Sequence, residues 1–115
     1  MPDSVCSVYK ESATTEATSV NAGTAITIDT RNFRTGLIAI KNTGSANTLQ
    51  YKIDGFANYD GDTDGIADKS ATDIAPSATV TFSFDGVTRS KRVITITPKV
   101  GGSQSTYIVE YCLGL

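Results

Sequence analysis

The sequence predicts an all-β protein, an antiparallel β-sandwich of seven to eight strands with an immunoglobulin-like or jelly-roll-like arrangement. Three observations predict it: β-branched residues are abundant, short segments alternate between apolar and polar residues, and turn-forming residues separate these segments. Isoleucine, valine and threonine supply 35 of the 115 residues, and their branched side chains favour a pleated sheet over a helix. We expect one domain over residues 1–115. A closed barrel fits the same strand lengths and is the alternative architecture.

The expected strands follow one another along the chain. We expect a first strand over residues 5–10 and a polar extended connection or edge segment over 11–19, which together form an N-terminal segment, 1–19. Six further segments alternate so that one side of each can be buried. They are residues 24–29, 37–41, 49–53, 80–84, 93–97 and 106–113. The polar stretch 54–73 is predicted to be a loop.

A shift of 56 residues superposes the first three of these six segments on the last three without a gap. Ile38 and Ile40 then fall on Ile94 and Ile96. The other matched pairs are Ile26 with Phe82, Ile28 with Phe84, Asp29 with Asp85, Leu37 with Val93, Tyr51 with Tyr107 and Ile53 with Val109. The pattern predicts two similar three-stranded units, and two sheets packed face to face would bury one side of each strand.

One motif in the polar stretch predicts a metal site. Aspartates occupy positions one, three, five and nine of a nine-residue loop: Asp60, Asp62, Asp64 and Asp68. Gly65 stands at position six, where the chain must turn sharply, and Ile66 at position seven offers its backbone carbonyl. Oxygen donors in this pattern bind Ca²⁺. The motif resembles the D-x-D-x-D-G-x-x-D loops of EF-hands, dockerins and thrombospondin-type repeats, and the resemblance implies a structural calcium ion.

The resemblance covers these nine residues and departs from the EF-hand at position twelve, where Ala71 stands in place of a bidentate glutamate. Asp73, two residues later, is the candidate for that role. The formal net charge of the chain is −2 and would be +2 without the four aspartates, so the cluster repels itself unless a cation or solvent compensates. The alternative is a solvated loop without metal.

The two cysteines, Cys6 and Cys112, lie near opposite ends of the chain in strand-like segments. The first and last strands of a sandwich are often neighbours, so a disulfide between them is geometrically feasible and would constrain the unfolded chain. The alternative is two buried free thiols, which pack as small apolar side chains.

Aromatic and basic residues give two further candidate binding surfaces. Phe56 and Tyr59 precede the acidic loop and form either a platform for sugar stacking or loop packing, whereas Tyr51 is expected in the core. Basic residues gather in the two connections that the 56-residue shift makes equivalent, as solvated loop charges or as a patch for an acidic partner. They are Arg31, Arg34, Arg89, Lys91 and Arg92.

The composition argues against several classes of protein. Histidine is absent, which removes the commonest general base, and no nucleophile–base pair is readable, so we do not expect an enzyme. A net charge of −2 argues against a nucleic-acid partner. No apolar run approaches the roughly 20 residues of a membrane helix, so we expect no membrane partner. The start Met1-Pro2-Asp3 lacks the basic and apolar regions of a leader.

A short threonine-rich sandwich with a Ser/Thr-rich N-terminal segment resembles the small accessory proteins of virions, such as head decoration and minor capsid proteins. The resemblance implies a non-enzymatic structural protein, located in the virion, that assembles as a homo-oligomer with itself or with other virion proteins. The alternative is an extracellular or cell-surface module, either a carbohydrate-binding or adhesion domain or the subunit of a surface filament.

Overall fold

Eight β-strands form the described part of the chain. The computed structural model describes residues 11–17, 24–60, 65–86, 88–100 and 105–114. The strands are β1 (Glu11–Ala17), β2 (Thr24–Asp29), β3 (Thr35–Asn42), β4 (Leu49–Phe56), β5 (Ile66–Ile74), β6 (Thr79–Asp85), β7 (Lys91–Pro98) and β8 (Ser105–Gly114). Within these ranges there is no helix, and therefore none long and apolar enough to cross a membrane.

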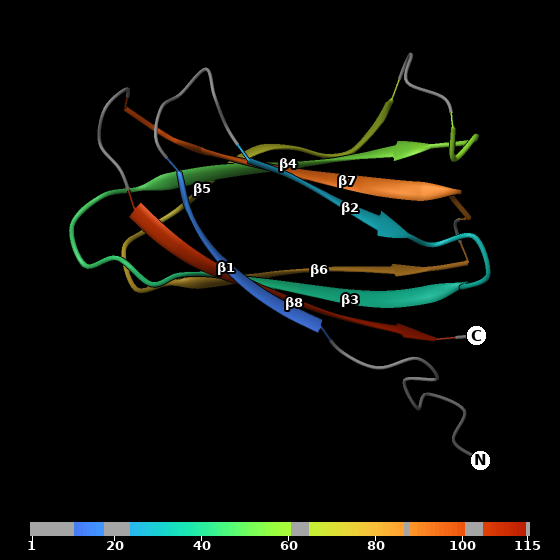
Figure 1. The fold of residues 1–115 in the computed structure, drawn as a ribbon, viewed down its shortest axis with the longest axis horizontal. Coiled ribbons are helices and arrows are strands. Elements are labelled where there is room, and N and C mark those ends of the chain that lie inside the picture. Colours follow the sequence, from blue (N-terminus) through green and yellow to red (C-terminus); the bar gives the residue numbers. More distant parts are fainter. Residues whose placement is uncertain (1–10, 18–23, 61–64, 87, 101–104, 115) are drawn as a thin grey trace.

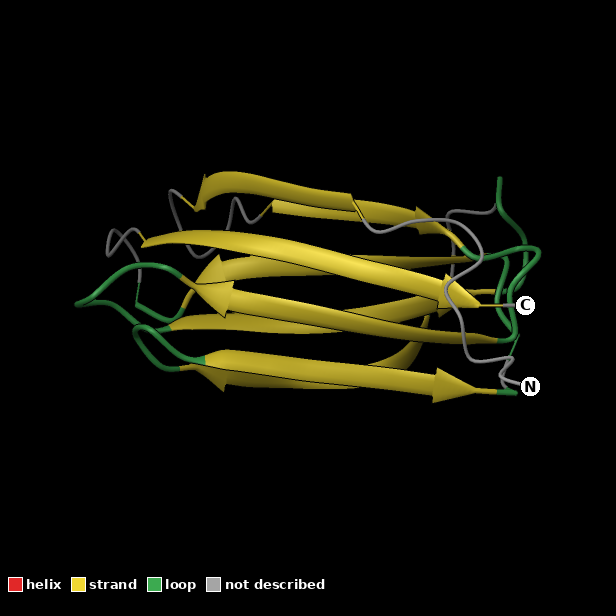
Figure 2. Ribbon diagram, turned by 90° about the horizontal axis from the view of Figure 1, so that it is seen from below, coloured by secondary structure: helices red, strands yellow, loops and turns green. Residues whose placement is uncertain are grey.

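The strands form two four-stranded antiparallel sheets, which are the upper and lower layers in Figure 1. Sheet A has the order β1-β8-β3-β6, and sheet B has the order β2-β7-β4-β5. The chain crosses between the sheets at every connection except the β4–β5 hairpin. This connectivity is that of a jelly roll, so of the two arrangements that the sequence predicts, the jelly roll is correct. Figure 2 shows the strands of both sheets running along one common direction.

The internal repeat relates one sheet to the other. β3 and β7 begin and end 56 residues apart, and β4 and β8 begin 56 residues apart. The same shift carries β2 onto β6 and β1 onto the middle of β5. Replacing each strand of sheet A by its counterpart reproduces the order of sheet B read from its other edge. The repeat that the sequence predicts is therefore a pseudo-twofold symmetry that exchanges the sheets.

The core lies between the sheets and uses equivalent residues from both. Buried pairs related by the shift include Ile38 with Ile94 and Tyr51 with Tyr107. The remaining equivalent pairs in which both members are apolar and buried are Ile40 with Ile96, Ile53 with Val109 and Ile28 with Phe84. Leu37, in contrast, is 47% exposed, because it lies on the other side of β3 from Ile38. The alternation therefore identified the inner face of the central strands.

Two polar segments form strands that the alternation does not reveal. The loop predicted over 54–73 is wrong for most of its length, because β4 continues to Phe56 and β5 begins at Ile66. Residues Glu11–Ala17 form β1, so the edge segment, not the connection, is the correct interpretation there. The strand predicted at 5–10 lies outside the described residues. β1 and β5 are both edge strands, and Ile74 alone is fully buried in β5, which leaves no alternation to detect.

Candidate functional site

One end of the sandwich brings together three connections that are distant in sequence. Thr30 N–H donates to the Ser90 carbonyl at 3.1 Å, and Ser90 N–H donates to the Phe56 carbonyl at 2.7 Å. Gly86 N–H donates to the Arg34 carbonyl at 2.8 Å. The β2–β3 and β6–β7 connections, which carry the basic residues, therefore lie side by side as their equivalence under the repeat predicts.

Two of these basic residues converge on one buried carboxylate. Arg92 Nε lies 3.0 Å from Asp68 Oδ2, and Arg89 Nη2 lies 2.9 Å from Asp68 Oδ1. The side chains of Arg92 and Asp68 are only 1% and 8% exposed. Burial lowers the pKa of Arg92, and the charge of Asp68 opposes that shift. For Arg92 the interpretation as a solvated loop charge is wrong, because its guanidinium is part of the interior.

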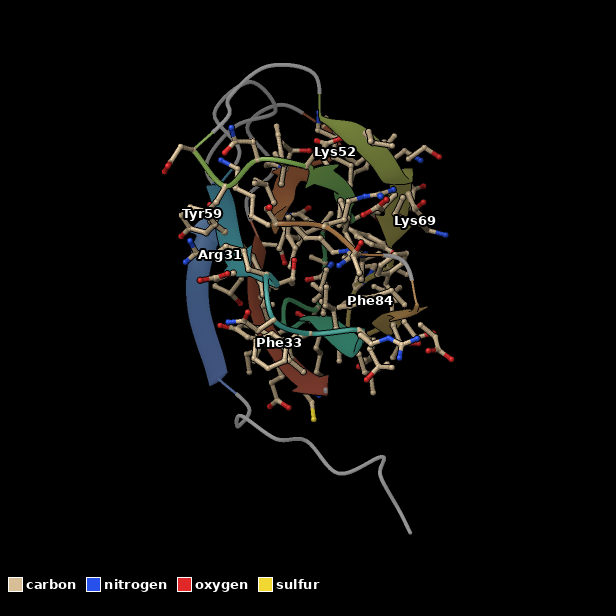
Figure 3. All side chains as sticks on the ribbon, turned by 90° about the vertical axis from the view of Figure 1, so that its right-hand side faces the viewer. Arg31, Phe33, Lys52, Tyr59, Lys69 and Phe84 are labelled. Atoms are coloured by element: carbon tan, nitrogen blue, oxygen red, sulfur yellow. The ribbon has the colours of Figure 1, made fainter. Side chains whose placement is uncertain are left out.

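The Arg92 guanidinium also stacks on an aromatic ring of the opposite sheet. It lies 3.6 Å from the centroid of Phe84, and Figure 3 shows Phe84 between the two layers. The ring needs the space that a glycine leaves, because a Cβ on Gly36 would lie 2.3 Å from Phe84 Cζ. Gly36 is the residue 56 positions before Arg92. The two sheets therefore differ at this end by the smallest and one of the largest side chains.

The predicted calcium ligands do not all lie together. Asp62 and Asp64 lie outside the described residues, Asp60 is exposed, and Ile66 begins β5 with its side chain 51% exposed. Both carboxylate oxygens of Asp68 accept hydrogen bonds from arginines, so an ion at Asp68 would have to displace one of them. Among the described residues, no three Asp, Glu or Cys side chains gather closely enough to hold a metal.

Asp73 is placed away from the acidic loop. It lies opposite Gln50 in the β4–β5 pair, whereas the loop joins β4 and β5 at the end where Gly55 faces Ile66. Seven residues of extended strand separate Ile66 from Asp73, about 23 Å of chain. Its carboxylate instead accepts hydrogen bonds from Lys99 and Gln50, which lower its pKa. Asp73 therefore already has two partners at a distance from the start of β5, and its role as the twelfth-position ligand stays a prediction.

The two candidate sugar-stacking rings hold cations on their faces. Arg31 lies 4.2 Å from the centroid of Tyr59, and Lys91 Nζ lies 4.8 Å from that of Phe56. Figure 3 shows Arg31 and Tyr59 next to each other at the side of the sandwich. Arg31 is further fixed by Asp29 at 2.6 Å; the hydrogen bond lowers the pKa of Asp29 and raises that of Arg31. A sugar would have to compete with these cations.

Cys112 lies on the outer side of sheet A and is disulfide-bonded. No described cysteine is free. Cys6, its predicted partner and the only other cysteine in the sequence, lies outside the described residues. The pairing of Cys6 with Cys112 therefore stays a prediction.

The outer face of sheet A is apolar along its middle. On β8, Ile108 and Glu110 point away from the core, as Leu37, Ala39 and Lys41 do on β3. These residues line two adjoining hollows of about 130 and 180 Å³. This face is not among the surfaces predicted from the sequence, although the sequence contains a signal for it: Ile108 occupies an outward position of an alternating strand, where a polar residue is expected.

The outer face of sheet B carries paired charges instead. Lys52 and Asp54 occupy the positions equivalent to Ile108 and Glu110, and Lys52 Nζ lies 3.6 Å from Asp54 Oδ2. Lys99 and Asp73 form a second ion pair on the same sheet. Figure 3 shows Lys52 on the outer side of its sheet. At the positions of Lys52 and Asp54, sheet B therefore presents an ion pair, whereas sheet A presents an apolar side chain beside an acid.

Comparison with known proteins shows the fold and no family. No family model and no curated protein matches the sequence. The chain is similar in structure to PirA, with a TM-score of 0.61 and 15% identity over 87% of this chain and 92% of that one. It is similar to a subunit of the disulfide-linked pili of Bacillus endospore appendages, with a TM-score of 0.51 and 14% identity over 93% and 88%.

A third similar structure is that of infectious bursal disease virus, strain Gt. The TM-score is 0.54 and the identity 10%, over 91% of this chain and 32% of that one. The chain therefore spans about a third of the viral protein. At these identities the likeness establishes a shared fold, and this fold occurs in components of assemblies, a pilus and a virus among them.

Proposed function

We propose that this chain is a non-enzymatic structural subunit of an ordered protein assembly, and that this assembly is a virion. The observation that carries the proposal is the outer face of sheet A. Leu37 and Ile108 hold apolar side chains outward at the centre of a strand pair. On sheet B the position of Ile108 is taken by Lys52, which pairs with Asp54, whereas the position of Leu37 is taken by Val93. An exposed apolar surface of this kind favours a protein partner over free solvent.

The fold supports the same proposal. Jelly-roll domains are frequent building blocks of viral shells, and the similar structures include a virus and a pilus. A sandwich of short strands is a rigid block that presents two broad outer faces and two ends, which suits repeated contacts.

A surface filament is the second candidate, and the disulfide at Cys112 favours it. Disulfides persist in oxidising surroundings, which include virions and cell surfaces. The similar pilus subunits belong to pili described as disulfide-linked. Virion and cell surface are therefore the two proposed locations. Within either assembly, calcium at Asp60, Asp62 and Asp64 remains a prediction for a structural role.

Electron microscopy of the purified protein tests the proposal. We expect regular particles or filaments in negative stain, and light scattering at a mass well above one 12.1 kDa chain. Co-expression with any shell protein encoded next to this chain should return the chain bound to the shells. A chain that forms no larger species, alone or with those neighbours, would contradict the assigned role.

A further inference from the structure

We propose that the outer face of sheet A is a two-fold contact between two copies of this chain, in which Lys41 of each copy pairs with Glu110 of the other. The inference rests on the proposed function and names its partner. It depends on three features of the face: an apolar centre, two charges without partners, and a register that makes the face complementary to itself.

The apolar centre is continuous. The hollow lined by Leu37 and Cys112 shares Ala39 and Glu110 with the hollow lined by Ile108 and Lys41. Ala39 forms a low floor between larger neighbours on this face. Covering Leu37 and Ile108 removes apolar surface from water, which is the main favourable term in association.

The two charges have no ion-pair partner within the described part of the chain. Glu110 and Lys41 take part in none of its salt bridges. The equivalent of Glu110 on sheet B is Asp54, which is paired with Lys52. On sheet A the residue equivalent to Lys52 is Ile108, so the local partner of the acid has been replaced by an apolar side chain. A partner subunit can supply the positive charge for Glu110 that Ile108 does not.

The register places these groups for a symmetric contact. Ala39 lies opposite Glu110, and Lys41 lies opposite Ile108, so Lys41 and Glu110 occupy two diagonal corners of a square. Ala39 and Ile108 occupy the other two. A two-fold axis along this second diagonal, in the plane of contact, brings Lys41 of one copy over Glu110 of the other. The same operation brings Ile108 against Ile108 of the partner subunit.

A second copy fits better than an unrelated protein because one surface supplies both halves of every pair. Two-fold contacts use the same patch on each subunit, and each copy here offers one acid and one base at reciprocal positions. The strands of the two facing sheets would cross at a large angle, which is one of the two common arrangements for packed sheets.

Sedimentation velocity over a concentration series tests this with charge variants. For the wild type we expect a species of twice the 12.1 kDa chain mass. Lys41→Glu and Glu110→Lys each place like charges across the contact and should raise the dissociation constant about ten-fold or more. The double variant K41E/E110K restores opposite charges and should return the constant to within about three-fold of the wild type. Lys52→Glu, on the equivalent strand of sheet B, is the matched control and should leave association unchanged.

Ile108→Lys gives a second, independent readout. It copies the residue of sheet B and supplies Glu110 with a local partner, so it should abolish association without lowering the melting temperature. The inference is overturned if the single charge variants associate like the wild type, if the double variant fails to restore association, or if the wild type is monomeric at about 0.5 mM. Electron microscopy separates the two proposals. Larger assemblies that still form in the charge variants would support the assembly role and refute this contact. Dimers that never assemble further would support this contact and refute the assembly role.

Discussion

The two sheets of this sandwich are two versions of one strand pattern that have diverged on their outer faces. Toward the interior they are alike, with Tyr51 matching Tyr107 and Ile38 matching Ile94. Toward the exterior, Lys52 and Asp54 of sheet B correspond to Ile108 and Glu110 of sheet A. Inward positions are alike because both sheets share one core, whereas outward positions meet different surroundings. The difference supports the proposal that sheet A is the side that binds a partner.

The ends of the two central strands differ as well. Gly36 occupies the position of β3 at which β7 has Arg92, and the ring of Phe84 contacts both residues. A buried guanidinium needs a carboxylate to compensate its charge and a surface on which to stack. Because the interior is close-packed, it also needs space, which a small residue on the opposite sheet provides. The large side chain of Arg92 on β7 is therefore accommodated because the equivalent residue of β3 is the glycine Gly36.

The largest expected effect comes from removing the carboxylate that compensates Arg92. Asp68→Ala should lower the free energy of unfolding by about 3–5 kcal/mol, because it leaves a charge buried without its partner. Urea unfolding followed by circular dichroism measures this. Asp54→Ala, which breaks the exposed pair with Lys52, is the control and should cost no more than about 1 kcal/mol. Equal losses in the two variants would mean that Arg92 does not depend on Asp68.

The next effect tests the glycine that faces the same cluster. Gly36→Ala places a methyl group where Phe84 Cζ lies 2.3 Å away and should destabilise the fold by about 1–3 kcal/mol through overpacking. The unfolding midpoint in urea reports it. In a Phe84→Leu background, which vacates the space, the same substitution should cost less; an unchanged cost would place the strain elsewhere than at the ring.

Much of this architecture was readable in the sequence, for a physical reason. A strand buried on one side must alternate, so the central strands and their inward residues, such as Ile38 and Ile94, could be predicted. The 56-residue offset also predicts a strand that the alternation does not reveal. Shifting β1 by that offset gives residues 67–73, which lie within β5. The repeat therefore relates these two edge strands, β1 and β5, although neither sequence alternates between apolar and polar residues.

The cluster around Asp68 could not be predicted in the same way. Asp68 lies 21 residues from Arg89 and 24 from Arg92, and no local pattern marks a buried ion pair. The acidic motif pointed instead to a metal, because Asp68 continues the spacing of Asp60, Asp62 and Asp64. Pairing in three dimensions decides which carboxylates remain free for a cation, and a linear motif does not contain that information.

Chelation tests what remains of the metal prediction, on the connection that precedes β5. With calcium at ten times its dissociation constant, binding stabilises the native state by ~1.4 kcal/mol, so EDTA should lower the melting temperature correspondingly. Asp62→Ala and Asp64→Ala should abolish this difference. Asp68→Ala and Asp73→Ala should preserve it, because arginines and a lysine hold these two carboxylates. Thermal melts that superimpose with calcium and with EDTA would show that no calcium ion stabilises the fold.

The smallest effect concerns the exposed charge pair at the other end of sheet B. The hydrogen bonds from Lys99 and Gln50 lower the pKa of Asp73 below its ordinary value of 3.8. A lowered pKa means that the folded state favours the carboxylate, so the pair stabilises the fold above about pH 4 and this contribution is lost as the pH falls through the folded pKa. Melting temperatures between pH 2 and 5 should therefore fall less steeply for Asp73→Asn than for the wild type. Lys99→Gln should remove the larger part of the same acid-dependent component, and the double variant should add little to either. If the two substitutions add in full, the acid dependence of Asp73 arises from groups other than Lys99.

Because the side chains of Asp73 and Lys99 are nearly half exposed, salt at 1 M should weaken this difference in acid dependence, whereas the loss of stability caused by Asp68→Ala should persist.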